Sequence, residues 1–200
     1  FLERTGISNF FIDLANCLCG SSAGGPAKVA VISSALCGMV SGSSVGNTVT
    51  TGSVTIPMMK KCGYRPEFAG AVEAAASTGG QIMPPIMGAA AFLMAEYMGV
   101  PYATVALKAI LPAVLYFAGI YIAVHLEAQK LGLRGIPREE LPQMRVLMKQ
   151  IYLLAPLIVL VVLVSTNTFT MQFSASVAIF AAIAVGALNR NNRITLKKIV

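Results

Sequence analysis

Apolar residues recur at helical spacing along most of the chain, and short polar or charged stretches separate the apolar segments. The N-terminal stretch mixes apolar and polar side chains at intervals of three and four, which predicts an amphipathic helix. Later segments are apolar nearly throughout. The pattern predicts an all-α chain made of an amphipathic helix at 1–25, a helical hairpin at 26–63, a broken helix at 64–100, a single helix at 101–128, a charged connector at 129–150, two helices at 151–189 and a basic segment at 190–200.

Composition assigns these helices to a membrane. Hydrophobic residues make up 56% of the chain and charged residues 12%, and the mean hydropathy is +0.74. These values lie outside the range of ordinary soluble domains. The fold class expected is therefore an all-α integral membrane protein.

The net charge of +7 is distributed in a pattern that predicts orientation. Lys and Arg gather in three gaps, around 60–65, 130–149 and 190–198, while the alternate gaps at 96–104 and 165–173 contain none. This alternation is the positive-inside pattern, so we expect a multi-pass protein whose basic loops are cytoplasmic. The basic residues form no stripe interleaved with aromatic residues, so nucleic acid is not an expected partner.

The first polar break, at 41–47, divides the segment 26–63 into two limbs. Each limb, 27–40 and 45–59, is shorter than the roughly 20 residues that a straight helical span needs. We therefore expect a re-entrant hairpin that enters and leaves by the cytoplasmic face, with the polar residues at its tip. The alternative is one long helix with a glycine-rich bend, since Gly42 and Gly46 also fit a small-residue packing pattern.

The second polar break lies at 77–85, inside a segment long enough to span. Paired prolines cannot donate backbone hydrogen bonds, so we expect the first half-helix to end near Thr78 and the second to start near Pro84. The alternative is a simple proline kink. The Ser, Thr, Gly and Gln residues beside the prolines favour a true unwinding.

Helix ends at such breaks present carbonyl groups to cations and amide groups to anions. Secondary transporters place discontinuous helices of this kind at the membrane midplane. The two breaks are therefore expected to form one shared cation site, in which sodium is a candidate ion, from Ser41, Gly42, Ser43, Ser44, Asn47, Ser77, Thr78, Gly79 and Gly80.

Three further polar residues have open interpretations. Glu73 lies about one turn before the second break; burial favours the neutral form of a carboxyl group and so makes it a candidate proton carrier, the alternative being a structural Glu. Gln81 either contacts substrate or hydrogen-bonds the unwound backbone. For Lys108, snorkelling toward lipid headgroups is the preferred interpretation.

The sequence gives little support for metal binding by cysteines, nucleotide binding or catalysis. The four cysteines have no metal-like spacing with the sole histidine, His125, and no phosphate-binding loop is present. No cofactor is expected beyond a coupling ion, sodium or a proton. An intramembrane enzyme or a channel-like membrane subunit remains the alternative to a carrier, but Glu73 is the only strong catalytic candidate at depth.

At the breaks the chain resembles a known family. The runs 24–29, 41–47 and 68–85 are similar to the large permease component (M-type) of tripartite ATP-independent periplasmic (TRAP) transporters. The stretch 71–85, with the residues up to Glu96, resembles the subgroup that has fused small and large membrane subunits and a TAXI-type binding protein. The chain looks like an internal fragment of such a protein.

The resemblance implies half of an elevator-type transporter in the bacterial inner membrane. It implies uptake of an organic anion, in particular a carboxylate, with a cation gradient, after a periplasmic solute-binding protein delivers the solute. A small membrane subunit or its fused equivalent is an expected partner, as is the lipid bilayer. Many relatives have Asp at the position of Asn47, so the identity of the coupling ion stays open.

Overall fold

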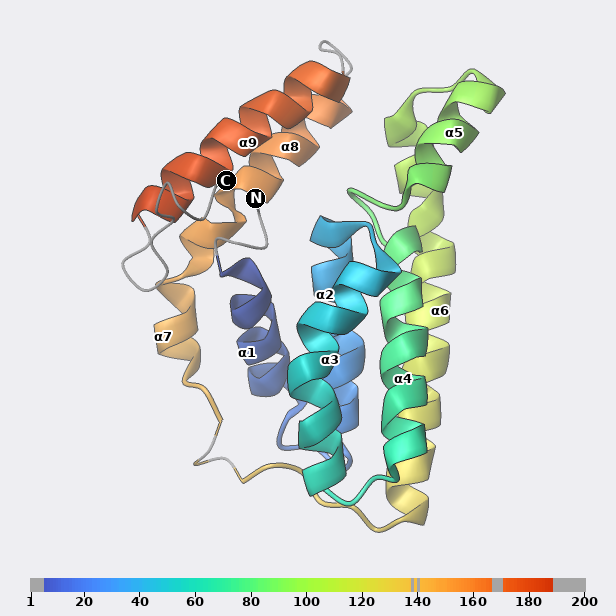
Figure 1. The fold of residues 1–200 in the computed structure, drawn as a ribbon, viewed down its shortest axis with the longest axis vertical. Coiled ribbons are helices and arrows are strands. Elements are labelled where there is room, and N and C mark those ends of the chain that lie inside the picture. Colours follow the sequence, from blue (N-terminus) through green and yellow to red (C-terminus); the bar gives the residue numbers. More distant parts are fainter. Residues whose placement is uncertain (1–5, 138, 140, 167–170, 189–200) are drawn as a thin grey trace.

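The computed structural model describes residues 6–137, 139, 141–166 and 171–188, and no strand occurs in these ranges (Figure 1). The predicted basic segment 190–200 lies outside the described residues. The helices are α1 (Ile7–Cys19), α2 (Gly25–Ser41), α3 (Ser44–Lys61), α4 (Pro66–Gly79), the 3-10 turn η2 (Gly80–Ile82), α5 (Ala89–Met98), α6 (Tyr102–Lys130), α7 (Met144–Met148), the 3-10 turn η4 (Ile151–Leu154), α8 (Ala155–Ser165) and α9 (Met171–Leu188).

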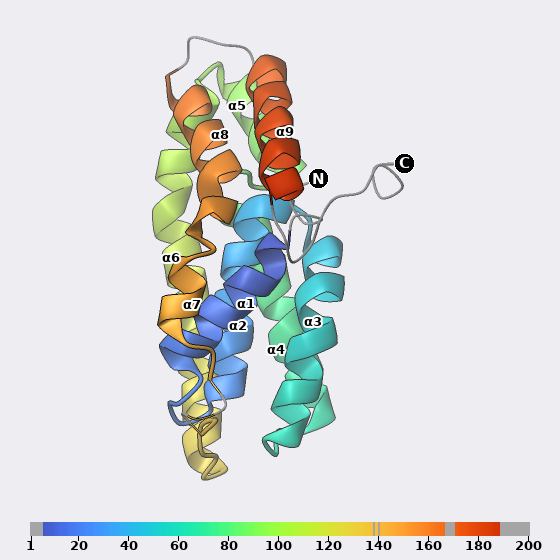
Figure 2. The same ribbon diagram turned by 90° about the vertical axis from the view of Figure 1, so that its left-hand side faces the viewer.

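The first polar break is a tight reversal between α2 and α3. Gly42 ends α2 in the left-handed conformation, with φ 60° and its N–H donating to the Gly38 carbonyl, a conformation that glycine adopts without steric cost. Ser43 caps α3, and its Oγ accepts from the N–H of Gly46 at 3.2 Å. The two helices run side by side in opposite directions (Figures 1 and 2), so the chain forms a helical hairpin here and not one bent helix.

The second polar break is longer than the sequence pattern indicated. Helix α4 ends at Gly79 and η2 follows, but α5 begins at Ala89, so the predicted restart near Pro84 is wrong. The N–H of Gly88 donates to the carbonyl of Gln81 at 2.7 Å, which closes the intervening segment into a loop. Met83 is extended, with φ −83° and ψ 115°, and Met87 has a φ of 52°, so the backbone between η2 and α5 is not helical.

Helix α6 contains 29 residues and continues through Pro112. Within the described ranges it is the single helix long and apolar enough to cross a membrane by length and composition; the other apolar helices are shorter. Much of its surface carries exposed large hydrophobic side chains, including Leu107, Leu111 and Leu115. Such a face suits contact with lipid or with further helices.

One core joins the hairpin to α4 and α6. Its buried side chains come from α2, α3, α4, α6 and the turn at Tyr64, and are Ala27, Ala30, Val31, Met59, Tyr64, Ala69, Val72, Ala76, Phe117, Val124 and Ala128. The small residues let the helices approach closely. Burial is the main cause that raises the pKa of Tyr64 to about 12, so this side chain remains a neutral part of the core.

The C-terminal part forms a separate pair of helices. The predicted connector 129–150 contains α7, and the next apolar segment starts as the 3-10 turn η4 before α8 begins at Ala155. Pro156 occupies the first turn of α8, where its missing N–H costs nothing. Helices α8 and α9 pack against each other beside the hairpin tip (Figure 2).

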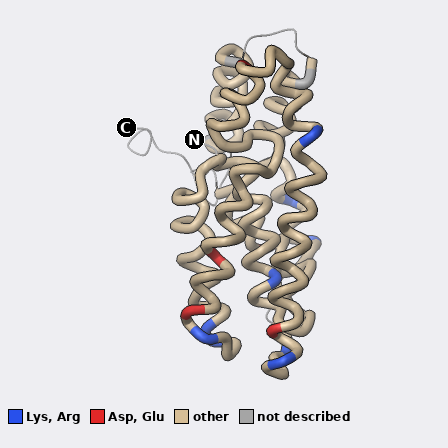
Figure 3. Tube along the Cα trace, turned by 90° about the vertical axis from the view of Figure 1, so that its right-hand side faces the viewer, with Lys and Arg blue, Asp and Glu red and all other residues tan. Residues whose placement is uncertain are grey.

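Charged residues gather toward one end of the bundle, where α3 and α6 end and α4 begins (Figure 3). Lys60, Lys61 and Lys130 lie in the last turns of their helices, where cations interact favourably with the helix dipole. Lys28 differs because it is only 4% exposed. Its Nζ donates to Ser22 Oγ at 3.2 Å and lies 5.4 Å from the ring centroid of Tyr121.

Candidate cation site

The C-terminal ends of α2 and α4 meet at two glycines. A Cβ on Gly38 would lie 2.3 Å from the Cα of Gly80, and a Cβ on Gly80 would lie 2.8 Å from the Cα of Gly38. No side chain fits between the two backbones. The last carbonyls of a helix carry partial negative charge, so this contact brings two electronegative helix ends together.

Asn47 lies beside this contact. It is 1% exposed, and a Cβ on Gly80 would be 3.0 Å from its Nδ2. The Nδ2 donates to the Ser34 carbonyl at 2.8 Å, which fixes the orientation of the amide. The Oδ1 is buried and has no hydrogen-bond partner. A buried acceptor without a donor costs about 1–3 kcal/mol, and a bound cation would remove that cost.

Glu73 occupies a cage of hydroxyl groups deeper in the bundle. It is fully buried at 0% exposed. Its Oε1 accepts from Ser34 Oγ at 3.0 Å, from Ser77 Oγ at 2.9 Å and from Thr51 Oγ1. Its Oε2 accepts from Thr55 Oγ1 at 2.5 Å. The cage joins α2, α3 and α4 through one carboxyl group.

The cage can satisfy both protonation states of the carboxyl group. Thr51 Oγ1 lies 2.8 Å from the Asn47 carbonyl, and Thr55 Oγ1 lies 3.0 Å from the Thr51 carbonyl. The ionised carboxylate can accept from all four hydroxyls; the protonated group can donate to Thr55 Oγ1, which then donates to its own helix. Neither form leaves a hydroxyl without an acceptor, so the hydrogen-bond geometry of the cage fits both forms of the carboxyl group.

Three of the remaining predicted site residues, Ser41, Thr78 and Gln81, lie nearer the surface, whereas Gly79 is buried. Ser41 Oγ is 3.5 Å from the Ser43 carbonyl, at the tip. Gln81 Nε2 donates to Ser44 Oγ at 2.8 Å and so links the second break to the hairpin tip. Thr78 Oγ1 donates to the carbonyl of Ala74 in its own helix and is exposed. The structure brings Asn47 and Gly80 together and leaves the Thr78 hydroxyl apart.

Close packing surrounds the glycines of the breaks. A Cβ on Gly79 would lie 2.4 Å from Cε1 of Tyr116, and Tyr116 is held in place by donating its OH to the Ala75 carbonyl at 2.9 Å. A Cβ on Gly42 would lie 2.4 Å from the carbonyl oxygen of Met87. Met87 itself has a φ of 52°, which is uncommon for a residue other than glycine. The two breaks therefore touch through backbone as well as side chains.

Sequence reasoning missed Ser34, Thr51, Thr55 and Gly38. Asn47, Thr51 and Thr55 are spaced by four residues, as are Glu73 and Ser77. Residues at this spacing share one face of a helix, so the two polar faces could have been recognised. Ser34 and Gly38 share a face of α2 in the same way, but only their contacts distinguish them from ordinary small packing residues.

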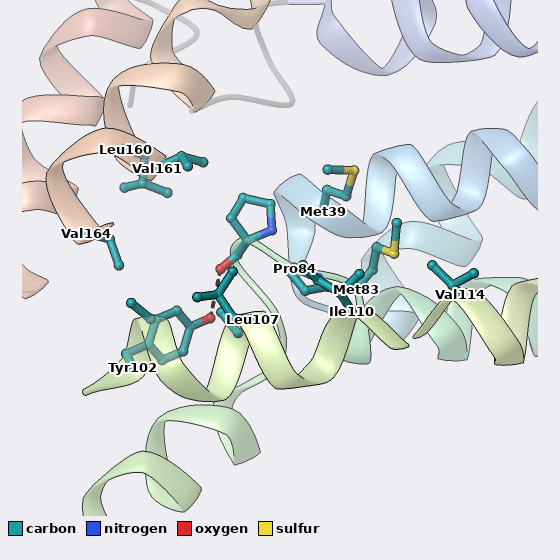
Figure 4. Close-up of a pocket in the computed structure, with 13 residues that line it drawn as sticks. Met39, Met83, Pro84, Tyr102, Leu107, Ile110, Val114, Leu160, Val161 and Val164 are labelled. Carbon is teal, nitrogen blue, oxygen red and sulfur yellow. Dashed lines mark hydrogen bonds between the residues drawn. The ribbon is translucent and has the colours of Figure 1, made fainter. Parts of the chain in front are cut away.

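An apolar cavity of about 450 Å³ lies beside the breaks, between the second break, α6 and α8 (Figure 4). Tyr102 stands at its edge, with its OH 2.9 Å from the Pro85 carbonyl and 2.7 Å from the Ile86 carbonyl. The single hydroxyl hydrogen lies within bonding distance of both carbonyls, which the proline-containing loop leaves without helical partners. A second cavity, of about 720 Å³, opens between the hairpin tip and the α8–α9 pair.

The oxygen atoms of the candidate site are ligands that suit a hard monovalent cation or a proton. The described residues contain no cluster of three or more His, Cys, Asp or Glu side chains that could hold a metal ion. The groups around Asn47 are amide and carbonyl oxygens, which are ligands of hard cations, while the Glu73 carboxyl group lies in its own cage of hydroxyls. Discontinuous helices that present such oxygens are characteristic of secondary transporters.

Comparison with known proteins agrees with this class. The model of the family "Tripartite ATP-independent periplasmic transporter, DctM component" matches residues 1–200. The chain belongs to this family, so it is part of the large permease component of a TRAP transporter, and membership of a permease family favours a transporter over an intramembrane enzyme.

Individual relatives carry related names. The chain is 28% identical over 141 residues to the C4-dicarboxylate TRAP transporter large permease protein DctM of Pseudomonas aeruginosa, covering 70% of this chain and 33% of that protein. It is 30% identical over 132 residues to a putative TRAP transporter large permease protein of Haemophilus influenzae, covering 66% and 31% respectively. The isethionate TRAP transporter permease protein DctMQ of Oleidesulfovibrio alaskensis is 33% identical over 85 residues, or 42% of this chain and 13% of that protein. The chain thus spans about a third or less of the length of these relatives.

Proposed function

We propose that this chain forms part of the membrane carrier that imports an organic anion, in particular a carboxylate, driven by a cation gradient. The observation that carries the proposal is Asn47, whose buried Oδ1 has no partner at the point where the ends of two helices meet. Relatives named for C4-dicarboxylate and isethionate support an organic anion as solute. In this proposal the solute is delivered by a periplasmic binding protein.

The coupling cation binds between the two breaks. Asn47 Oδ1 is one ligand, and the terminal carbonyls of α2 and α4 supply the others. The negative ends of both helices favour a cation at this position. The ion would replace the donors that the amide oxygen lacks.

Sodium and a proton remain the two candidate coupling ions, and they would use different parts of the site. Sodium would bind at Asn47 and the helix ends. A proton would bind at Glu73, whose hydroxyl cage accommodates both the ionised and the neutral carboxyl group. Both carboxyl oxygens of Glu73 already accept from hydroxyl groups, so the two ions are not expected to share one set of ligands.

The hairpin is proposed to be re-entrant. Helices α2 and α3 contain 17 and 18 residues, or about 26 and 27 Å at 1.5 Å per residue, against a hydrocarbon core of about 30 Å. A tip that lies inside the bilayer, with the charged end of the bundle at the cytoplasmic face of the bacterial inner membrane, fits these lengths and the positive-inside pattern. An elevator-type movement of this part of the protein would then carry the site across.

The partners follow from the same proposal. A small membrane subunit, separate or fused, completes the permease, and the fused DctMQ relative is an example of such a fusion by its name. The sequence features at 71–85 favour the subgroup that uses a TAXI-type binding protein. These assignments concern the whole transporter, of which this chain is a part.

Uptake into proteoliposomes tests the proposal. The full permease is reconstituted with its small subunit, the binding protein is added outside, and solute recovered from the binding protein is supplied in labelled form. Uptake that needs both the binding protein and an imposed sodium or proton gradient is expected. Uptake that proceeds equally without the binding protein would support a channel-like subunit instead.

A further inference from the structure

A cavity of about 740 Å³ lies between the hairpin tip, the second break, α5 and α6. Its lining is mostly apolar, from residues such as Met94, Met98 and Val100. This volume lies within the range of small-molecule sites, which are usually apolar with a few polar groups that fix the ligand. The polar residues in this lining are Ser43, Gln81, Thr104 and Lys108.

Lys108 is the unexpected member of this lining. It lies six residues into α6, about 9 Å from the start of the helix at 1.5 Å per residue, and the next Lys or Arg in the helix is Lys130. In the described part of the chain, Lys108 has no ion pair or hydrogen bond. Glu96 is the acidic residue of α5, but the α5 residues that line the cavity, from Ala89 to Met98, do not include it.

Helix α5 contributes backbone donors to the same space. The helix begins at Ala89, and its cap residue Gly88 has no side chain that could accept a hydrogen bond. Ala89, Ala90 and Gly88 all line the cavity. The first amides of a helix have no partner within the helix and attract negative charge. The N–H of Gly88 is bonded to the Gln81 carbonyl and the N–H of Ala91 to the Gly88 carbonyl, so the amides left for a ligand are those of Ala89 and Ala90. The cavity thus combines an unpaired ammonium group with these two amides.

We propose that this cavity binds the anionic group of the transported solute, with Lys108 as its charge partner and the start of α5 as hydrogen-bond donor. The ligand class is a carboxylate or sulfonate that carries an apolar body, because the rest of the wall is Met, Val, Ile and Ala. A heavily hydroxylated body would leave its hydroxyls facing apolar side chains, which is costly. The inference rests on the proposed function and adds to it the anion-binding residue and the character of the solute.

The proposal competes with snorkelling of Lys108 to lipid headgroups, in which the charge lies outside the cavity and does not act on its contents. A single cysteine inside the cavity distinguishes the two. Ala109 lines the cavity next to Lys108, and Ala109→Cys changes the wall by one sulfur atom. The variant is made in the full transporter and treated with a matched pair of thiol reagents, an anionic methanethiosulfonate (ethylsulfonate) and a cationic one (ethyltrimethylammonium).

The reaction rate at position 109 is followed by mass spectrometry of its peptide, which separates it from the four native cysteines. The ratio of the anionic to the cationic rate is expected to be at least tenfold higher at position 109 than at an exposed control position, and Lys108→Met should reduce the ratio at position 109 about tenfold. Lys108→Arg should preserve the ratio. Tyr97→Cys, at an 88% exposed position outside the cavity lining, is the control whose ratio Lys108→Met should leave unchanged.

If Lys108→Met leaves the ratio of the two reaction rates at position 109 unaltered, the proposal is wrong, because the charge of Lys108 would then not act in the cavity. If the cysteine of the Ala109→Cys variant reacts with neither reagent, the proposal is also wrong, because protein would then fill the cavity. In uptake assays, Lys108→Met should raise the solute KM at least tenfold without changing the cation dependence. If uptake needs no binding protein or cation gradient while the reagent ratio behaves as expected, the proposed function fails and the anion site stands.

Discussion

Gly38 and Gly80 place the backbones of α2 and the second break in direct contact, with no room for a side chain on either residue. We expect Gly38→Ala to push the break away from the hairpin, because its Cβ would lie 2.3 Å from the Cα of Gly80. Overpacking of this kind costs about 1–3 kcal/mol. Thermal unfolding of the purified permease should show the loss, together with a weaker cation dependence of uptake.

Gly70→Ala is the matched control for this variant. Gly70 lies in α4, the helix that leads to Gly80, and a Cβ there would meet nothing within 4 Å. Replacing a helical glycine with alanine favours the helix by about 0.5–1 kcal/mol, so stability should rise slightly. Equal effects of the two substitutions would contradict the importance of the Gly38–Gly80 contact.

Asn47→Ala should lower the apparent affinity for the coupling cation at least tenfold while changing stability by only about 1 kcal/mol. The substitution removes one hydrogen bond, to Ser34, which is worth about that amount, and also removes the buried oxygen that lacks a donor. The measurement is uptake as a function of sodium concentration at constant pH, and separately as a function of pH. Thr48→Ala removes a hydroxyl that bonds only within α3 and should leave both dependences unchanged.

The Glu73→Gln variant distinguishes a proton-coupled carrier from a sodium-coupled carrier. The amide is close in size to the carboxyl group but cannot gain or lose a proton, so a proton-coupled carrier should lose uptake driven by a pH gradient while the protein still folds. A sodium-coupled carrier should keep its sodium dependence. If Glu73→Gln leaves uptake and its pH dependence unaltered, Glu73 is structural and the proton role is lost.

Gly79→Ala should destabilise the permease because its Cβ would collide with the ring of Tyr116. Tyr116→Ala creates space beside this position, so the double variant Gly79→Ala with Tyr116→Ala should recover part of the loss. A double-mutant cycle on thermal stability measures this coupling. Additive effects would mean that the Tyr116 ring moves aside freely, despite its hydrogen bond to the Ala75 carbonyl.

The spacing of apolar and polar residues predicted much of the local architecture, because the local architecture depends only on neighbouring residues. The hairpin 26–63 and the end of the first half-helix near Thr78 could be read from glycines, prolines and limb lengths. The restart of the second half-helix could not, since α5 begins only where Gly88 bonds back to the Gln81 carbonyl. That hydrogen bond joins residues in a loop whose path no helical pattern describes.

The helical character of the chain, its suitability for a membrane and its two polar breaks could be read from the sequence, because these properties follow from composition and local spacing. Which of the polar residues meet depends on how the helices pack. This packing buries Asn47 beside Gly80, surrounds Glu73 with hydroxyls from three helices, and sets Thr78 apart on its own helix. Such contacts join residues up to about forty positions apart, and they depend on helix crossings that the close approach of Gly38 and Gly80 permits.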